Sequence, residues 1–341
     1  TMQSYVGGYG QMIHPVGACA TAAVSIEEGV DKIRLGKARV VVAGGIDDIS
    51  VESLTGFGDM NATANTQEML DQGIEPRYIS RAGDRRRAGF LEAEGGGTVI
   101  LARADVAADL GLPVLGVVAY AQSFADGAHT SIPAPGIGAL AAARGGRESS
   151  LARGLSSVGL TIDDVAVVSK HDTSTNANDP NEAELHARIC AALGREAGNP
   201  LYVISQKTLT GHAKGGAAVF QIAGLCDLMR TQTIPANRSV DCVDPQMAAH
   251  TPLVWLRHRL SMGHHPVRAA VLTSLGFGHV SALVALAHPR AFEAALAHER
   301  GAESARSWRD RAEERLVRGQ AHRQAAMCGH AQLFEPIDHR R

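Results

Sequence analysis

Short runs of small and β-branched apolar residues recur along the chain, with stretches of helical character between them. Buried strands are predicted at 38–43, 95–102, 114–124, 165–169 and 202–204, with a hairpin of strands at 271–274 and 282–287. Helices are predicted at 20–30, 105–110, 139–158, 181–193 and 212–230. This alternation predicts a layered α/β protein in which helices pack on sheets.

Composition supports such a core and narrows the classes of partner. Hydrophobic residues make up 45% of the 341 residues but aromatic residues only 4%, so small side chains must allow close helix–sheet packing. The net charge of −2 argues against a nucleic-acid partner. No apolar run is long enough to span a membrane, so we expect no membrane partner.

The cysteines indicate a reducing environment. Five of them are scattered along the chain, and none belongs to a CxxC pair. This pattern argues against a zinc site and a disulfide framework, and it favours a cytoplasmic protein. Because the first residue is Thr1 rather than Met, we expect the chain to be part of a longer protein.

The chain is predicted to consist of two halves and a tail. A loop at 126–138 contains two prolines and three glycines, and we place the boundary near it. The parts are therefore 1–128, 129–290 and a charged, helical tail at 291–341. A polar, punctuated excursion at 47–87 is predicted to contain short helices, and long excursions of this kind tend to be functional or to cover an interface.

Cys19 lies among small residues in the sequence PVGACATAAV, where a helix is predicted to begin. Unpaired N–H groups and the helix dipole favour an anion at that position. We therefore predict a lowered pKa for the Cys19 thiol and a nucleophilic role for it. The alternative is a buried cysteine that acts as a small hydrophobic residue.

A second polar stretch, KHDTST at 170–175, follows the strand predicted at 165–169. It places His171 at a strand end, where sites assemble in α/β folds. The hydroxyl groups of Thr173 and Thr175 are predicted to fix either the imidazole or the loop. The alternative is an ordinary turn with a histidine that has no function.

Two further stretches come off predicted strands. The sequence SQKTLTGHAKGGAA at 205–218 carries Lys207 and His212 and then small residues that allow close packing. The sequence SLGFGH at 274–279 has glycines on both sides of Phe277, so its backbone N–H groups could face a developing oxyanion. The alternatives are a helix-capping segment with a solvated lysine and a plain hairpin turn.

Three other motifs give little indication of a functional site. The glycines at 95–97 precede a strand instead of joining a strand to a helix, so they predict no nucleotide site. The histidines at 264–265 lack metal-ligand spacing, and no metal is expected. The arginines at 85–87 predict a solvated surface or ion pairs between domains, and contact with an acidic carrier is a further alternative.

Together these stretches resemble the β-ketoacyl synthases of the thiolase superfamily. Cys19 in GACAT, His171 in KHDTST, Lys207 and His212 in KTLTGHAKGGAA, and Phe277 in GFGH occur in the order of that family. The resemblance covers roughly residues 1–290. It implies a thiolase-like fold with α-β-α-β-α layers, N-terminally truncated because only 18 residues precede the nucleophile.

Some details resemble one branch of the family. The usual small residue after the first histidine is Asp172 here, the run after the second carries Lys214, and GFGH replaces the common GFGG. The segments FGDMNATAN and GFLEAEGGG are similar to type I, multidomain forms. The chain thus resembles the ketosynthase region of a bacterial type I fatty acid synthase.

The resemblance implies a decarboxylative Claisen condensation of an acyl-enzyme thioester with malonyl-acyl carrier protein, giving a 3-oxoacyl product in fatty acid elongation. Cys19 would be the nucleophile, and His171 and His212 would stabilise the enolate. The N–H groups of Cys19 and Phe277 would form an oxyanion hole, with Phe277 also a gate. Lys207 would orient the histidines, paired with Asp179 or Glu182.

By the same resemblance, no cofactor is bound, because 4′-phosphopantetheine arrives on the acyl carrier protein. Expected partners are acyl and malonyl carrier proteins, the other domains of a synthase and, in the complete protein, further copies of the chain. Two alternatives stay open. One is a thiolase-like, non-decarboxylating acyltransferase, which needs a second cysteine as base, and the other is a non-catalytic structural or dimerisation fragment.

Overall fold

The computed structural model describes residues 10–127 and 137–331 of the chain. Residues 128–136 of the loop expected at the boundary lie outside this description. So do residues 1–9, at the start of the chain, and residues 332–341 of the predicted tail.

A six-stranded mixed sheet forms the centre of the molecule. Its strands run in the order β3-β10-β9-β4-β5-β7. The strands β9, β4, β5 and β7 are parallel, whereas β10 is antiparallel to β9 and β3. The bounds are β3 Val117–Ala125, β4 Val165–Ser169, β5 Leu201–Ile204, β7 Leu253–Trp255, β9 Ala269–Gly276 and β10 Val280–Ala287. The predicted hairpin is confirmed as β9–β10, and both of its strands are longer than predicted.

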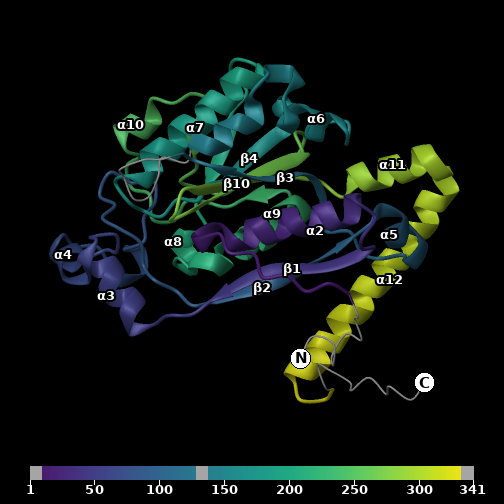
Figure 1. Ribbon diagram of the computed structural model, residues 1–341, viewed down its shortest axis with the longest axis horizontal. Coiled ribbons are helices and arrows are strands. Elements are labelled where there is room, and N and C mark those ends of the chain that lie inside the picture. Colours follow the sequence, from purple (N-terminus) through teal and green to yellow (C-terminus); the bar gives the residue numbers. More distant parts are fainter. Residues whose placement is uncertain (1–9, 128–136, 332–341) are drawn as a thin grey trace.

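Helices and a second sheet lie on the two faces of this sheet. Figure 1 shows α6, α7 and α10 on one face, and α2 and α9 between the other face and the two-stranded sheet β1–β2. The elements of the inner layers are α2 Thr21–Arg34, α9 Ala217–Thr231, β1 Val40–Asp47 and β2 Gly95–Ala102. Two separate apolar clusters fill the two sides of the six-stranded sheet. Helix, sheet, helix and sheet therefore follow one another as layers.

The outer face of β1–β2 is apolar and exposed. Along both strands, residues that face α2 alternate with residues that face outward, as expected for a sheet with one covered face. Val42 and Ile100 are cross-strand neighbours, and both are among the exposed apolar residues. Val40 and Ile46 continue this surface along β1.

Two predicted helices are shorter than expected. The region 139–158 consists of η3 Ile137–Ala143, η4 Gly146–Glu148 and α6 Ser150–Ser156, because Gly145 and Gly146 adopt left-handed φ values of 95° and 59°. The helix predicted from residue 212 begins instead as α9 at Ala217, after the turn η6 Lys214–Gly216. Strand β3, which precedes the predicted boundary at 128, pairs with β10 of the second half.

The remaining helices and two short strands border the layers. The excursion at 47–87 contains short helices, as predicted, and the described part of the tail consists mainly of the two helices α11 and α12. These elements are α3 Val51–Asp59, α4 Thr66–Asp71, η2 Pro76–Tyr78, α5 Ala104–Leu110, η5 Ile162–Asp164, α7 Asn178–Leu193, β6 Thr233–Ile234, α10 Pro245–Ala248, β8 Leu260–Ser261, α11 Arg290–Arg300 and α12 Ala302–Met327. In the described ranges, no helix combines the length and apolarity needed to cross a membrane.

Ion pairs tie the excursion to the second half. The guanidinium of Arg87 lies 2.6 Å from the carboxylate of Asp244, and that of Arg81 lies 2.7 Å from Asp241. Arg86 also pairs with Asp241. Of the alternatives for the arginines at 85–87, ion pairs between segments therefore describe Arg86 and Arg87.

Close contact between the layers generates a stability prediction. A Cβ at Gly45 of β1 would lie 3.0 Å from the Ala22 Cβ and closer still to the carbonyl oxygen of Gly215. We expect Gly45→Ala to lower the free energy of unfolding by about 1–3 kcal/mol, because the layers must separate to admit the methyl group. Urea unfolding measures the change. The control Gly56→Ala, in α3 with open space around it, should leave stability unchanged or raise it; equal effects of both variants would contradict the packing argument.

Candidate active site

Cys19 occupies a strained turn at the entrance to α2. It lies in the short helix η1 Ala18–Ala20, directly before α2, and is 4% exposed. The preceding residue, Ala18, has a left-handed φ of 46°. The Thr21 hydroxyl accepts the Gly17 N–H at 3.0 Å and donates to the Ala18 carbonyl at 2.7 Å, which fixes the turn. The cysteine is thus held at a helix start, as predicted.

The end of β9 lies directly against this turn. The Ser274 hydroxyl donates to the Cys19 carbonyl at 3.0 Å. A side chain at Gly276 would collide with the Gly17 carbonyl oxygen, so only glycine permits this approach. The backbone N–H of Phe277 then acts on the sulfur and lowers the pKa of the thiol. The Gly-Phe-Gly turn therefore supplies an N–H group beside the cysteine.

The predicted fall in the Cys19 pKa is wrong. Burial raises the pKa of this thiol to about 11, although Lys207, the Phe277 N–H and Lys214 lower it. Desolvation of a thiolate inside the protein outweighs these favourable contacts. The sulfur therefore carries a proton at neutral pH.

His171 follows β4 and has a defined tautomer. Its Nδ1 accepts the Leu275 N–H at 3.2 Å and lies 3.0 Å from the Lys207 Nζ, which also donates to the His171 carbonyl. Burial lowers the pKa of His171 well below 6.5, and the charge of Lys207 and the neighbouring His212 lower it further. A neutral ring whose Nδ1 accepts carries its proton on Nε2. His171 is therefore a hydrogen-bond donor through Nε2.

His212 faces His171 across the site. It follows the short helix α8 Lys207–Thr210, and its N–H donates to the Leu91 carbonyl at 2.8 Å. The two imidazole centroids are 5.2 Å apart and nearly perpendicular, at 89°. Burial, then Lys207 and Lys214, lower the pKa of His212 well below 6.5. The structure thus brings together both predicted histidines and Lys207, with the rings neutral.

Aromatic rings lead from Phe277 to His212. The Phe277 ring lies 5.6 Å from Phe57 of α3, Phe57 lies 5.3 Å from Phe90, and Phe90 lies 5.1 Å from the His212 ring. Phe57 and Phe90 were not predicted as site residues. They lie within the segments FGDMNATAN and GFLEAEGGG, respectively. Both segments are noted in the sequence, but no role is assigned there to these two residues.

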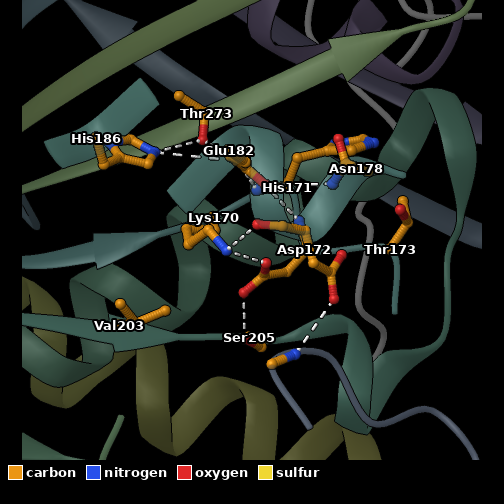
Figure 2. A network of polar contacts seen from close by, with 12 residues as sticks. Lys170, His171, Asp172, Thr173, Asn178, Glu182, His186, Val203, Ser205 and Thr273 are labelled. Atoms are coloured by element: carbon orange, nitrogen blue, oxygen red, sulfur yellow. Dashed lines mark hydrogen bonds and ion pairs between the residues drawn. The ribbon is translucent and has the colours of Figure 1, made fainter. Parts of the chain in front are cut away.

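The predicted carboxylate partners of Lys207 have other contacts. Glu182 of α7 accepts the N–H groups of His171 and Asp172 and the hydroxyl of Thr273, as Figure 2 shows in part. Asp179 accepts the Gly83 N–H at 3.2 Å. In the described part of the chain neither forms an ion pair with Lys207, since each is already engaged elsewhere. Glu182 instead holds the backbone of the histidine loop.

Burial has the largest effect on the pKa of Lys207. Burial lowers its pKa to about 8, opposed by the charges of Glu182, Cys19, Asp172 and Asp179. The amine therefore stays mostly protonated at physiological pH, although it gives up its proton more readily than an exposed lysine, and it contacts His171.

Thr173 and Thr175 fix the loop rather than the imidazole. Their hydroxyl oxygens are 3.0 Å apart, and that of Thr175 accepts the N–H of Asn178, at the start of α7, at 3.2 Å.

A second lysine, Lys214, also approaches the site. It has a left-handed φ of 40° and lies 2.7 Å from the carboxylate of Glu92. The sequence singled out Lys214 as a departure from the family pattern, but its partner Glu92 was missed because the two are far apart in the chain.

Because both histidines are neutral, we predict that the folded protein loses stability as the pH falls. Their lowered pKa values mean that below pH 6.5 the unfolded chain binds protons that the folded chain does not. Stability should therefore fall as pH falls, by up to about 1.4 kcal/mol per pH unit for each histidine. Urea unfolding between pH 7.5 and 5.5 should show a smaller slope for His212→Asn. The exposed His298, changed to Asn, is the control; equal slopes for all three proteins would contradict the prediction.

Comparisons with solved structures identify the fold. The noncanonical ketosynthase FabY from P. aeruginosa superposes with a TM-score of 0.86 at 24% identity, covering all of this chain and 53% of that chain. The Streptomyces albus oxazolomycin ketosynthase domain OzmH KS7 gives a TM-score of 0.69 at 23% identity, covering 83% and 47%. The predicted thiolase-like α/β fold is confirmed.

The sequence relatives are subunits that are much longer than this chain. The fatty acid synthase alpha subunit hexA of Dothistroma septosporum is 39% identical, with 86% of this chain and 19% of that protein covered. The fatty acid synthase subunit alpha of Saccharomyces cerevisiae is 30% identical, with 86% and 20% covered. The chain thus spans about a fifth of the length of these relatives.

Family models match both parts of the chain. The model of the β-ketoacyl synthase N-terminal domain matches residues 2–107, and that of the C-terminal domain matches residues 115–241. The boundary at 128 stays a prediction, since the two matches leave residues 108–114 between them. Both domain models fall on this one chain in their proper order, and the chain belongs to the β-ketoacyl synthase family.

Proposed function

We propose that this chain catalyses the decarboxylative Claisen condensation of an acyl-Cys19 thioester with malonyl-acyl carrier protein. The observation that supports this most is the meeting of Cys19, two neutral histidines and Lys207, which come from both parts of the chain. A nucleophile beside backbone N–H groups and two imidazole donors suits thioester exchange followed by enolate formation.

In the first step, the Cys19 sulfur attacks the carbonyl of an acyl thioester on the carrier protein. The N–H groups of Cys19 and Phe277 stabilise the tetrahedral oxyanion. The carrier sulfur then leaves and takes up a proton, which balances the proton lost by the Cys19 thiol. Because the thiol pKa is raised, attack and proton loss occur together rather than from a preformed thiolate.

In the second step, the malonyl thioester loses CO₂, and the electron pair of the broken C–C bond forms an enolate. His171 and His212 donate to the thioester oxygen where this charge develops. Lys207, at the Nδ1 of His171, keeps the donor proton on Nε2. The enolate carbon attacks the acyl carbonyl, the C–S bond to Cys19 breaks, and one proton from solvent restores the thiol.

The proposed setting is fatty acid elongation within a larger cytoplasmic synthase. The named relatives are fatty acid synthase alpha subunits, which supports acyl chains as substrates and other synthase domains as partners. The substrates would arrive on 4′-phosphopantetheine of carrier domains, with no resident cofactor. Those relatives are fungal, so the predicted bacterial type I source and the homo-oligomeric state are part of this proposal.

Loss of the nucleophile tests the first step. Incubation with an acyl carrier thioester should add the acyl mass to the wild-type chain, and peptide mapping should place it on Cys19. Cys19→Ala should gain no mass, whereas the exposed Cys242→Ser should be acylated normally. A wild-type chain that gains no mass would favour the non-catalytic alternative, and acylated Cys19→Ala would place the nucleophile elsewhere.

Loss of a donor tests the second step. His212→Ala should keep acylation of Cys19 but lower condensation by at least about 100-fold, because one of two donors to the enolate is gone. Quantification of CO₂ and 3-oxoacyl product by mass spectrometry measures this split. An unchanged condensation rate would exclude the role assigned to His212.

A further inference from the structure

Asp172, next to His171, has a backbone conformation that side chains rarely adopt. Its φ is 36°, in the left-handed region, and Ser174 two residues later has a φ of 62°. A residue without a Cβ would meet no steric penalty there. The chain nevertheless places a fully buried carboxylate at this position. We therefore expect the side chain to make contacts that compensate for the strained backbone.

The Asp172 carboxylate has two partners. The Lys170 Nζ lies 2.5 Å from its Oδ1, and the Ser205 hydroxyl donates to its Oδ2. Figure 2 shows the carboxylate between these groups. The Asp172 N–H donates to Glu182 at 2.9 Å, and Lys170 also donates to the Asp179 carbonyl at 3.2 Å. Both oxygens of this buried carboxylate therefore have a partner inside the protein.

These contacts join the two loops that carry the site. Lys170, His171 and Asp172 follow β4, whereas Ser205 follows the neighbouring parallel strand β5. Lys207 comes two residues after Ser205. The contact between Asp172 and Ser205 therefore lies beside the contact between His171 Nδ1 and Lys207 Nζ, and links the same two loops.

We propose that Asp172, held by Lys170 and Ser205, is a positioning residue that sets His171 against Lys207 for the condensation step. The inference rests on the proposed function. Misplacement of a catalytic group by about 1 Å costs up to about 100-fold in rate, so a device that fixes this distance has a measurable effect.

The charge of Lys170 depends on the Asp172 carboxylate for compensation. Lys170 is 1% exposed, and its ammonium faces Asp172 and the backbone of Asp179. The carboxylates of Asp172, Glu182 and Asp179 oppose the effect of burial and raise the pKa of Lys170. Removal of Asp172 alone leaves this cation without its nearest partner, which favours a rearranged loop.

Three variants separate positioning from mere folding. Asp172→Gly relieves the left-handed conformation but removes the carboxylate. The double variant Lys170→Met/Asp172→Gly also removes the unpaired charge. Ser205→Ala removes only the contact to the second loop. Urea unfolding of each variant confirms that a folded protein is assayed.

We expect Asp172→Gly to acylate Cys19 at the wild-type rate, yet to lower the kcat of condensation between about 10- and 100-fold with KM for malonyl carrier protein unchanged. The double variant should stay impaired, and Ser205→Ala should shift kcat in the same direction. Wild-type condensation by Asp172→Gly, or its restoration in the double variant, would overturn the inference.

An independent readout does not need activity. Long-range ¹H–¹⁵N spectra with ¹⁵N-labelled histidine, assigned with His171→Asn, should show the Nε2–H tautomer for wild-type His171. In Asp172→Gly the Leu275 N–H still binds Nδ1, but the Nδ1 resonance should shift because the contact with Lys207 is weakened. An unchanged Nδ1 resonance would overturn the inference. Absence of acylation in the wild type would instead overturn the proposed function, so the two failures are distinguishable.

Discussion

Removal of the site from water is the constraint on which its chemistry depends. Desolvation is the largest influence on the pKa values of Cys19, His171, Lys207 and His212, and in each case it disfavours the charged form. Neutral imidazoles can donate hydrogen bonds without an added positive charge. A dry site would also strengthen each donor that faces the enolate of the proposed reaction. The same burial raises the Cys19 pKa, so the attack proposed for its sulfur requires concerted proton loss.

Most polar groups around this buried site have partners, although the Nδ1 of His212 has none among the described residues. Glu182 binds two backbone N–H groups of the histidine loop and the Thr273 hydroxyl of β9, which connects α7, β4 and β9 through one carboxylate. Lys170 with Asp172, and Lys214 with Glu92, are further buried pairs around the site. Left-handed conformations at Asp172 and Lys214 occur within these pairs, where surrounding contacts hold the strained backbone in place.

Local sequence patterns predicted most helices and strands, whereas they did not predict contacts between residues far apart in the chain. Strands β2 and β4 have their predicted bounds, because β-branched runs flanked by glycine or polar residues define them. The break at Gly145 was missed, since helical propensity does not reveal left-handed φ values. Cys19, His171, Lys207 and His212 were found from motifs. The Glu182 contacts and the raised Cys19 pKa depend on tertiary burial, which one-dimensional spacing does not contain.

Much of the environment of Cys19, the proposed nucleophile, comes from a strand far along the chain. Ser274 and Gly276 of β9 contact the Cys19 turn, and the Phe277 N–H acts on its sulfur. Some 255 residues separate Cys19 from Ser274. The Phe277 N–H can lie beside the Cys19 sulfur only when β9 occupies its place in the central sheet. A chain with a misplaced β9–β10 hairpin would therefore carry a buried cysteine that lacks this N–H group, which the proposed oxyanion hole needs.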